Sequence, residues 1–210
     1  MPFNISTVID HSRLSKNVVL KNRLVAKTKN SSVWTESGYD LFAQEGLEGI
    51  QVERLARILQ LNKSGFYHYF GDLEGFCLEL LSLHRKKISA FLQDVSVAGN
   101  LDPEYLVLLV AHAKTIMFQV HLTRHKEDKI FYREGEAIDR RLDAGVQQLW
   151  CNYVGTQYNP DIAMRYYSIV WDRFYTRVTF ENLHYRFLHD LVSDAKMLIH
   201  DIARPRSVEA

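Results

Sequence analysis

Hydrophobic and polar residues recur with a helical period along most of this chain, most clearly between residues 51 and 70. Four apolar residues in this stretch are spaced i, i+3, i+4, i+7: Val52, Leu55, Ala56 and Leu59. This spacing predicts a helix over 52–59 with one inward face. Asn62 is a favourable N-cap, so we expect a second short helix over 63–70. The pattern therefore predicts two short helices joined by a tight bend.

The second helix has a small, polar and basic outward face at its N-terminal end. Phe66 and Phe70 are spaced to face inward, and Leu61 is expected to anchor the bend to the core. This leaves five residues facing out: Lys63, Ser64, Gly65, Tyr67 and His68. Such a helix suits insertion into the DNA major groove, which is about 12 Å wide. The alternative is an ordinary pair of packed amphipathic helices without a role in binding.

Helical periodicity extends on both sides of this pair. A first helix is expected from about Ser32 to Gly46, with Gly38 allowing close packing and an inward stripe of Trp34, Leu41 and Phe42. A fourth helix is predicted from Asp72 to about residue 93, with a solvated basic patch over 84–87. The break at 97–101 then separates this part from the remainder of the chain.

The remainder of the chain is predicted to form about five helices. Asp102, Pro103 and Glu104 are typical of a helix start. The expected helices cover residues 105–122, 125–133, 135–153, 159–182 and 185–203. The last carries an apolar stripe of Leu188, Leu191, Ala195, Leu198 and Ile202. With only four prolines and ten glycines in 210 residues, we predict an all-α fold.

Charge is unevenly distributed, although the net charge is only +1. Residues 11–35 contain no acidic residue and six Lys or Arg residues: Arg13, Lys16, Lys21, Arg23, Lys27 and Lys29. Residues 36–75, in contrast, contain seven acidic and three basic residues, a net charge of −4. We expect residues 1–30 to form a basic arm that follows the phosphate backbone, or alternatively a solvated leader.

Composition favours a cytoplasmic protein with no membrane segment. Cys77 and Cys151 show no pairing pattern, which fits a reducing compartment. No apolar run approaches the roughly 18 residues of a membrane span, and no signal-peptide core is present at the N-terminus.

The stretch from Gly38 to Phe76 resembles the DNA-binding head of the tetracycline-repressor (TetR) family of bacterial transcription regulators. The matching residues are Leu41-Phe42-Ala43, Gly46, Leu55-Ala56, Phe66-Tyr67-His68-Tyr69-Phe70, Asp72 and Glu74. The resemblance implies a basic arm at 1–30, a helix-turn-helix DNA-binding domain at 31–75, and a helical effector-binding and dimerisation body at 76–210. Gln60 and Leu73 stand where the family commonly has Gly and Lys.

The resemblance also assigns roles on DNA. Lys63, Ser64 and Gly65 would face base edges, and Tyr67 and His68 would contact phosphates. Tyr69 faces either the core or a phosphate. Gln51 stands at the family's capping and phosphate-binding position, where its amide can still donate to a phosphate.

By the same resemblance, the protein is a regulator without catalytic residues, metal or cofactor. It would act as a homodimeric repressor that pairs through residues 161–203, binds a palindromic operator in double-stranded DNA and is released by a small-molecule effector. The effector pocket would use aromatic and neighbouring side chains of the body: Tyr105, Met117, Phe118, His121, Trp150, Tyr153, Trp171 and Phe174. The alternative is that most of these residues are simply core.

A second hypothesis makes the protein an all-α ligand-binding protein or a metal-dependent enzyme. His121 and His125 are spaced i, i+4, and Asp128 follows at i+7, so one helix face would present two imidazoles and a carboxylate. The flanking lysines Lys126 and Lys129 favour solvated histidines near a helix end instead. A serine-nucleophile elbow and a phosphate-binding glycine loop are both missing from the sequence.

Overall fold

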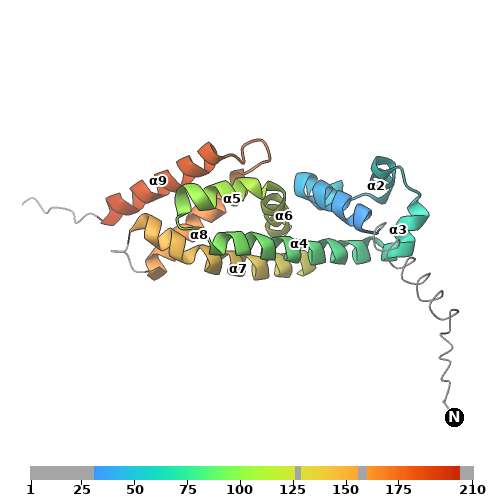
Figure 1. Ribbon diagram of the computed structural model, residues 1–210, viewed down its shortest axis with the longest axis horizontal. Coiled ribbons are helices and arrows are strands. Elements are labelled where there is room, and N and C mark those ends of the chain that lie inside the picture. The colour runs from blue at the N-terminus through green and yellow to red at the C-terminus, as the bar shows by residue number, and fades with distance from the viewer. Residues whose placement is uncertain (1–30, 126–128, 156–159, 204–210) are drawn as a thin grey trace, which may run out of the picture.

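The computed structural model describes residues 31–125, 129–155 and 160–203, and side chains up to residue 200. All regular elements within these ranges are helical, which confirms the predicted all-α fold. Figure 1 shows an elongated molecule with α2 and α3 at one end, α8 and α9 towards the other, and α4 running from one part to the other. The predicted basic arm, residues 1–30, lies outside the described residues.

The head comprises a helix over residues 31–45, the short turn η1 (Leu47–Gly49), α2 (Val52–Leu59) and α3 (Lys63–Phe70). Both predicted helices of the 51–70 stretch have the predicted bounds. Phe66 is fully buried, with ring centroids 5.5 Å from Trp34 and 5.0 Å from Phe76. Gly38 allows this packing, because a Cβ at that position would collide with the Phe76 ring.

Three turn residues of the head, Gly46, Gln60 and Gly71, have positive φ angles, and one predicted anchor is wrong. Gly46 adopts φ 73° and ψ −158°, a conformation that essentially only glycine adopts. Gln60 is in the left-handed region at φ 54° and ψ 38°, where the family pattern has glycine. Leu61 is 43% exposed and does not anchor the bend to the core. Its amide instead donates to the carbonyl oxygen of Ala56, so the backbone holds the turn.

Helix α4 (Leu73–Ser96) belongs to both parts of the molecule. Its N-cap is Asp72, whose carboxylate accepts a hydrogen bond from the Gly75 amide at 2.8 Å. The expected division at residues 75 and 76 falls inside this continuous helix. The predicted solvated patch over 84–87 is wrong at His84, which is fully buried because the imidazole faces the interior.

The body consists of η2 (Leu101–Tyr105), α5 (Leu106–Ala111), α6 (Ala113–Arg124), α7 (Lys129–Val154), α8 (Pro160–Arg177) and α9 (Tyr185–Ala203). The predicted helix over 105–122 is interrupted, because the chain bends by 83° at His112. The two predicted helices over 125–133 and 135–153 are instead one helix, α7, and α8 ends five residues earlier than expected.

Helix α9 has the predicted bounds, and most of its apolar stripe is buried. Leu188, Leu191 and Ala195 pack into the core. Leu198 is 58% exposed, contrary to the expected inward position, and the Ile202 side chain lies outside the described side chains.

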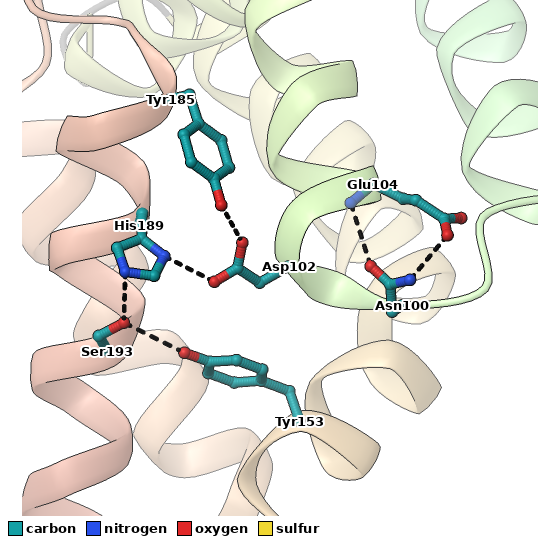
Figure 2. A network of polar contacts seen from close by, with 7 residues as sticks. All are labelled: Asn100, Asp102, Glu104, Tyr153, Tyr185, His189 and Ser193. Atoms are coloured by element: carbon teal, nitrogen blue, oxygen red, sulfur yellow. Dashed lines mark hydrogen bonds and ion pairs between the residues drawn. The ribbon is translucent and has the colours of Figure 1, made fainter.

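The start of the body differs from the predicted Asp-Pro-Glu cap. Asn100 caps the first turn, accepting a hydrogen bond from the Glu104 amide at 3.1 Å. The Asp102–Pro103 peptide bond is cis, and the Asp102 carboxylate faces α9. Figure 2 shows the Tyr185 hydroxyl donating to it at 2.7 Å, and the His189 Nδ1 atom also lies 2.7 Å from it. Asp102 therefore ties η2 to α9.

Within the described residues, no single helix is long and apolar enough to cross a membrane. The two bent segments from Leu101 to Arg124 are together long and apolar enough for a membrane span by length and composition alone. Many of their apolar side chains are instead buried in the core.

Candidate nucleic-acid interface

The N-terminal turn of α3 is presented to solvent on a rigid support. Asn62 caps the helix by accepting a hydrogen bond from the Ser64 amide at 3.0 Å. Lys63 and Ser64 are exposed, and Gly65 is partly exposed, with Tyr69 Cε2 3.9 Å from where its Cβ would lie. Phe66, buried beneath them, fixes the orientation of the helix. A cap, a small exposed turn and a buried aromatic anchor are what a groove-entering helix requires.

The other predicted DNA-contacting residues are also at the surface. Tyr67 is 50% exposed and His68 is exposed, whereas Tyr69 is half-buried and packs against the core. Gln51 is exposed ahead of α2 and makes no side-chain cap; its amide donates weakly to the Glu48 carbonyl oxygen at 3.4 Å. The side-chain amide of Gln51 therefore lies in solvent, within reach of an approaching phosphate.

Lys63, the lysine proposed to contact bases, forms an ion pair that the spacing of residues did not predict. Lys63 Nζ lies 3.0 Å from Glu53 Oε1 on α2. The hydrogen bond from Lys63 lowers the pKa of Glu53, and the same bond raises the pKa of Lys63. The two residues are ten positions apart on different helices, so only their opposite charges hinted at the contact. Glu53 therefore competes with a base for the Lys63 ammonium group.

A second ion pair holds α2 against the first helix of the head. The Arg54 guanidinium binds the Glu45 carboxylate with both terminal nitrogens, with Nη2 2.6 Å from Oε1. This bidentate contact lowers the pKa of Glu45 through its hydrogen bond to Arg54. Arg54 is therefore engaged within the protein, and the remaining basic residue of α2, Arg57, is exposed.

The head contacts the body through stacked aromatic rings. Phe118 on α6 stacks on Tyr39 at a centroid distance of 4.4 Å and on Phe42 at 4.1 Å. Two ion pairs flank the stack: Lys114 to Asp40 at 2.7 Å, and Lys87 to Glu36 at 3.2 Å. Movement of α6 would therefore be transmitted directly to the first helix of the head.

A chain of polar side chains runs beneath this stack. The Tyr39 hydroxyl lies 2.8 Å from His84 Nδ1, and His84 Nε2 lies 3.0 Å from Gln119 Oε1. Gln119 Nε2 then donates to Asp139 Oδ1 at 2.7 Å and to the Gly135 carbonyl oxygen at 2.9 Å. The Tyr175 hydroxyl donates to the same Asp139 oxygen at 2.8 Å. The five side chains are hereafter called the polar relay, and they connect the head to α4, α6, α7 and α8: Tyr39, His84, Gln119, Asp139 and Tyr175.

Burial shifts the acid–base properties of the polar relay. Desolvation lowers the pKa of His84 to about 3, although the hydrogen bond to Gln119 opposes the shift. Desolvation raises the pKa of Asp139 to about 6, against the hydrogen bonds from Tyr175 and Gln119. At neutral pH the imidazole is therefore uncharged and the carboxylate carries a charge.

His121 and His125, the candidate metal ligands, contact the head. The Leu47 amide donates to His125 Nε2 at 3.3 Å, and His125 Nε2 lies 3.6 Å from Glu48 Oε2. His121 Nε2 is buried without a hydrogen-bond partner, and burial lowers the pKa of this imidazole. Asp128 lies outside the described residues, and within those residues no group of three His, Cys, Asp or Glu side chains is arranged to hold a metal.

The residues predicted to line an effector pocket do not surround one cavity. Tyr105, Trp171 and Phe174 border a void of only about 10 Å³ in the body core. Met117, Phe118 and His121 lie on α6, where Phe118 and His121 contact the head. Trp150 donates to the Ala163 carbonyl oxygen at 2.7 Å, and the Tyr153 hydroxyl lies 3.4 Å from Ser193 Oγ, next to α9.

A larger groove, of about 730 Å³, opens between α6, α7 and α8. Asp139 and Tyr175 of the polar relay are among its lining residues. Tyr175 also borders the small internal void, so the groove and the void share one wall. Sequence spacing did not indicate this groove, because its wall residues come from three helices.

In Figure 2, Asp102, His189 and Ser193 are linked one to the next, in the way that the aspartate, histidine and serine of a catalytic triad are linked. Asp102 Oδ2 lies 2.7 Å from His189 Nδ1, and His189 Nε2 lies 3.5 Å from Ser193 Oγ, at the outer limit of a hydrogen bond. Ser193 lines neither the groove of about 730 Å³ nor the small internal void. The geometry shown is that of a polar contact between η2, α7 and α9.

Comparison with known proteins identifies the head. Residues 35–80 match the family model described as bacterial regulatory proteins, tetR family. Comparison with curated proteins and with solved structures gives no significant match. The matched range holds α2, α3, their capping residues and the first turns of α4, the same elements that present Lys63, Ser64 and Tyr67. Residues 35–80 are therefore a DNA-binding helix-turn-helix domain of the kind found in the tetR family of bacterial regulatory proteins, a family of transcription regulators.

Proposed function

We propose that this protein is a cytoplasmic, homodimeric repressor that binds a palindromic operator and is released by a small-molecule effector. The observation that carries the proposal is the exposed N-terminal turn of α3, capped by Asn62 and anchored by Phe66, in a domain matched by the family model. Lys63, Ser64 and Gly65 read base edges in this proposal, while Gln51, Tyr67, His68 and Tyr69 contact the backbone.

Dimer formation is supported by apolar side chains left exposed on α8 and α9. Ile162 is 48% exposed, Ile169 62% and Leu198 58%, and all three lie within residues 161–203, the segment expected to pair. Two copies related by a two-fold axis would cover these side chains and would present two α3 helices to a palindromic site. Two heads would also double the few positive charges that each contributes.

Electrostatics supports a role for the N-terminal arm. Within the head, Lys63 and Arg54 are paired with carboxylates, so little free positive charge remains for phosphates. In the proposal, residues 1–30 form the basic arm, residues 31–75 read the operator, and residues 76–210 bind the effector and dimerise. The six basic residues of 11–35 would supply much of the affinity.

The proposal is tested by footprinting the full-length protein on the DNA upstream of its own gene. We expect a protected palindrome, with Lys63→Ala relaxing the sequence preference and Tyr67→Phe weakening binding about equally on all sequences. Deletion of residues 1–29 should flatten the salt dependence of binding. An absence of protection, or equal binding to unrelated DNA at moderate salt, would contradict the proposed function.

A further inference from the structure

The groove between α6, α7 and α8 is lined by charged and aromatic residues that have no role in the proposed DNA contacts. It measures about 730 Å³, within the range of small-molecule sites. Six of its lining residues carry charge or an aromatic ring: Arg124, Tyr132, Glu136, Asp139, Asp172 and Tyr175. A ligand here would contact polar groups as well as ring faces, and it would touch the end of the polar relay.

The groove is net negative because three carboxylates line it against one guanidinium, and that guanidinium is engaged by backbone carbonyl oxygens. Arg124 donates through Nε and Nη2 to the Tyr175 carbonyl oxygen, at 3.0 and 2.6 Å, and through Nη2 to the Val178 carbonyl oxygen at 3.1 Å. These contacts hold the guanidinium against the C-terminal end of α8, where carbonyl oxygens are unpaired. Three lining carboxylates, Glu136, Asp139 and Asp172, remain to act on a ligand.

Tyrosines and a positioned carboxylate complete a site of defined geometry. Tyr132 donates to Glu136 at 2.7 Å, and Tyr175 and Gln119 both donate to Asp139 Oδ1, so these carboxylates are held by neighbouring side chains. Tyrosine ring faces attract cations, and carboxylates accept charge-assisted hydrogen bonds from ammonium groups. The combination selects against anions and favours a cation that also carries apolar surface.

We propose that this groove is the effector site, that its ligand is a small organic cation bearing an ammonium group and an apolar body, and that binding is transmitted to the DNA-binding head through the polar relay. The inference deepens the proposed function, since it assigns the effector's chemical class and the route of its signal. Tyr175 lines both this groove and the small internal void.

The signal begins when the ligand's ammonium group binds Asp139. Asp139 Oδ1 now receives two hydrogen bonds, so a third donor competes with Gln119 for the oxygen. Gln119 is 1% exposed and lies between the groove and His84, so displacement of its amide changes the partner of a buried imidazole. His84 in turn positions the Tyr39 hydroxyl, whose ring stacks on Phe118. The head helix over 31–45 therefore responds to an event in the groove.

Binding is tested with two probes of similar shape and opposite charge, phenethylamine and phenylacetate, by titration calorimetry on the full-length protein without DNA. We expect phenethylamine to bind and phenylacetate not to bind. Glu136→Gln and Asp172→Asn should each weaken the amine about tenfold, the usual size of one charged contact. Glu181→Gln, an exposed acid outside the groove, is the matched control and should leave the affinity within about twofold. Binding of both probes, or equal losses in all three variants, would overturn the assignment.

Transmission is tested by amide hydrogen exchange of residues 31–45 with and without phenethylamine. We expect the amine to alter exchange in the wild type, and Gln119→Met to abolish this response while the amine still binds. His84→Asn, which replaces the imidazole by a smaller polar group, serves as a second variant in case Gln119→Met unfolds. A preserved exchange response in a folded relay variant would overturn the proposed route. Because neither experiment uses DNA, a failure here is distinct from a failure to find an operator.

Discussion

Glu53 and Lys63 show how one residue can restrain a DNA-reading surface. The carboxylate lies 3.0 Å from the ammonium group that is proposed to contact bases, and it would also repel phosphates. Both side chains are exposed, so the pair is weak and easily exchanged for DNA. Its effect on affinity is nevertheless direct, because the Glu53 carboxylate competes with DNA for the Lys63 ammonium group.

We therefore expect Glu53→Gln to tighten operator binding by about two- to fivefold at low salt, since one exposed pair need not be broken. Fluorescence anisotropy with a labelled operator measures the change. Glu79→Gln removes the same charge from an exposed position on α4 and serves as the control. Equal gains in both variants would show that the effect is net charge rather than release of Lys63.

His84 and Asp139 give the molecule opposing responses to pH. The pKa of His84 falls from its ordinary value of 6.5 to about 3 on folding, so the unfolded chain binds more protons and stability is lost as pH falls below about 6.5. The pKa of Asp139 rises from 3.8 to about 6, so the folded chain binds more protons and stability is lost as pH rises through this window. Between pH 4 and 6 the two contributions have opposite signs.

Asp139→Asn should leave the pH dependence of stability to His84, because the opposing contribution of Asp139 is removed. The variant lacks the cost of a half-buried carboxylate, so relative to the wild type its free energy of unfolding should increase from pH 4 to 6.5, by on the order of 2 kcal/mol. Urea denaturation at half-unit pH steps measures the difference. A difference that stays constant across this range would mean that Asp139 titrates normally in the folded state.

Gly38 and Gly65 differ in how much room the packing of the head leaves for a side chain. Gly38 faces the Phe76 ring at a distance that leaves no room for a Cβ, whereas the nearest atom to a Cβ at Gly65 would be Tyr69 Cε2 at 3.9 Å. Gly38 therefore permits close approach of two helices. Gly65 has no such constraint within the protein, and its missing side chain matters only for what approaches α3 from outside.

Substituting alanine at these positions should separate folding from DNA binding. Gly38→Ala should lower the free energy of unfolding by about 1–3 kcal/mol through overpacking. Gly65→Ala should raise it slightly, by up to about 1 kcal/mol, because alanine favours a helix. It should nonetheless weaken operator binding by holding α3 off the groove floor. Thermal unfolding and anisotropy measure the two effects; unchanged operator affinity in Gly65→Ala would argue against insertion of this turn.

At the scale of the whole molecule, the arrangement in Figure 1 separates the helix proposed to read DNA from the helices proposed to self-associate. The head lies at one end of α4, and α8 and α9 lie towards the opposite end. Exposed apolar side chains on α8 and α9 are the surface that a second copy would cover in the proposed dimer.

Ile169→Asp combined with Leu198→Asp should yield monomers at micromolar concentration, because the proposed dimer would then bury unpaired carboxylates. Val97→Asp adds a charge at a position that is 83% exposed outside α8 and α9, and should leave the dimer intact. Light scattering measures the molar mass. A monomeric wild type would contradict the proposed dimer itself, whereas a dimeric double variant would place its interface elsewhere.

Local sequence was sufficient for the helices of the head. The bounds of α2 and α3, the Asn62 cap and the inward faces of Trp34 and Phe66 all follow from spacing and capping within a few residues. The same reasoning did not predict the bend at His112, and it divided the single helix α7 into two. An apolar run does not reveal an 83° bend, and the interior glycine Gly135, which packs against Leu122, resembles a helix break in sequence.

The sequence by itself therefore determined the all-α class, the helix-turn-helix segment and the residues on its outward face, because these depend on periodicity along one helix. Only the tertiary structure decided that Lys63 is paired with Glu53, that His84 is buried in a polar relay, and that an acidic groove lies over Asp139. Each of these joins side chains from different helices. Such contacts are set by how helices pack, and spacing along a single helix contains no information about them.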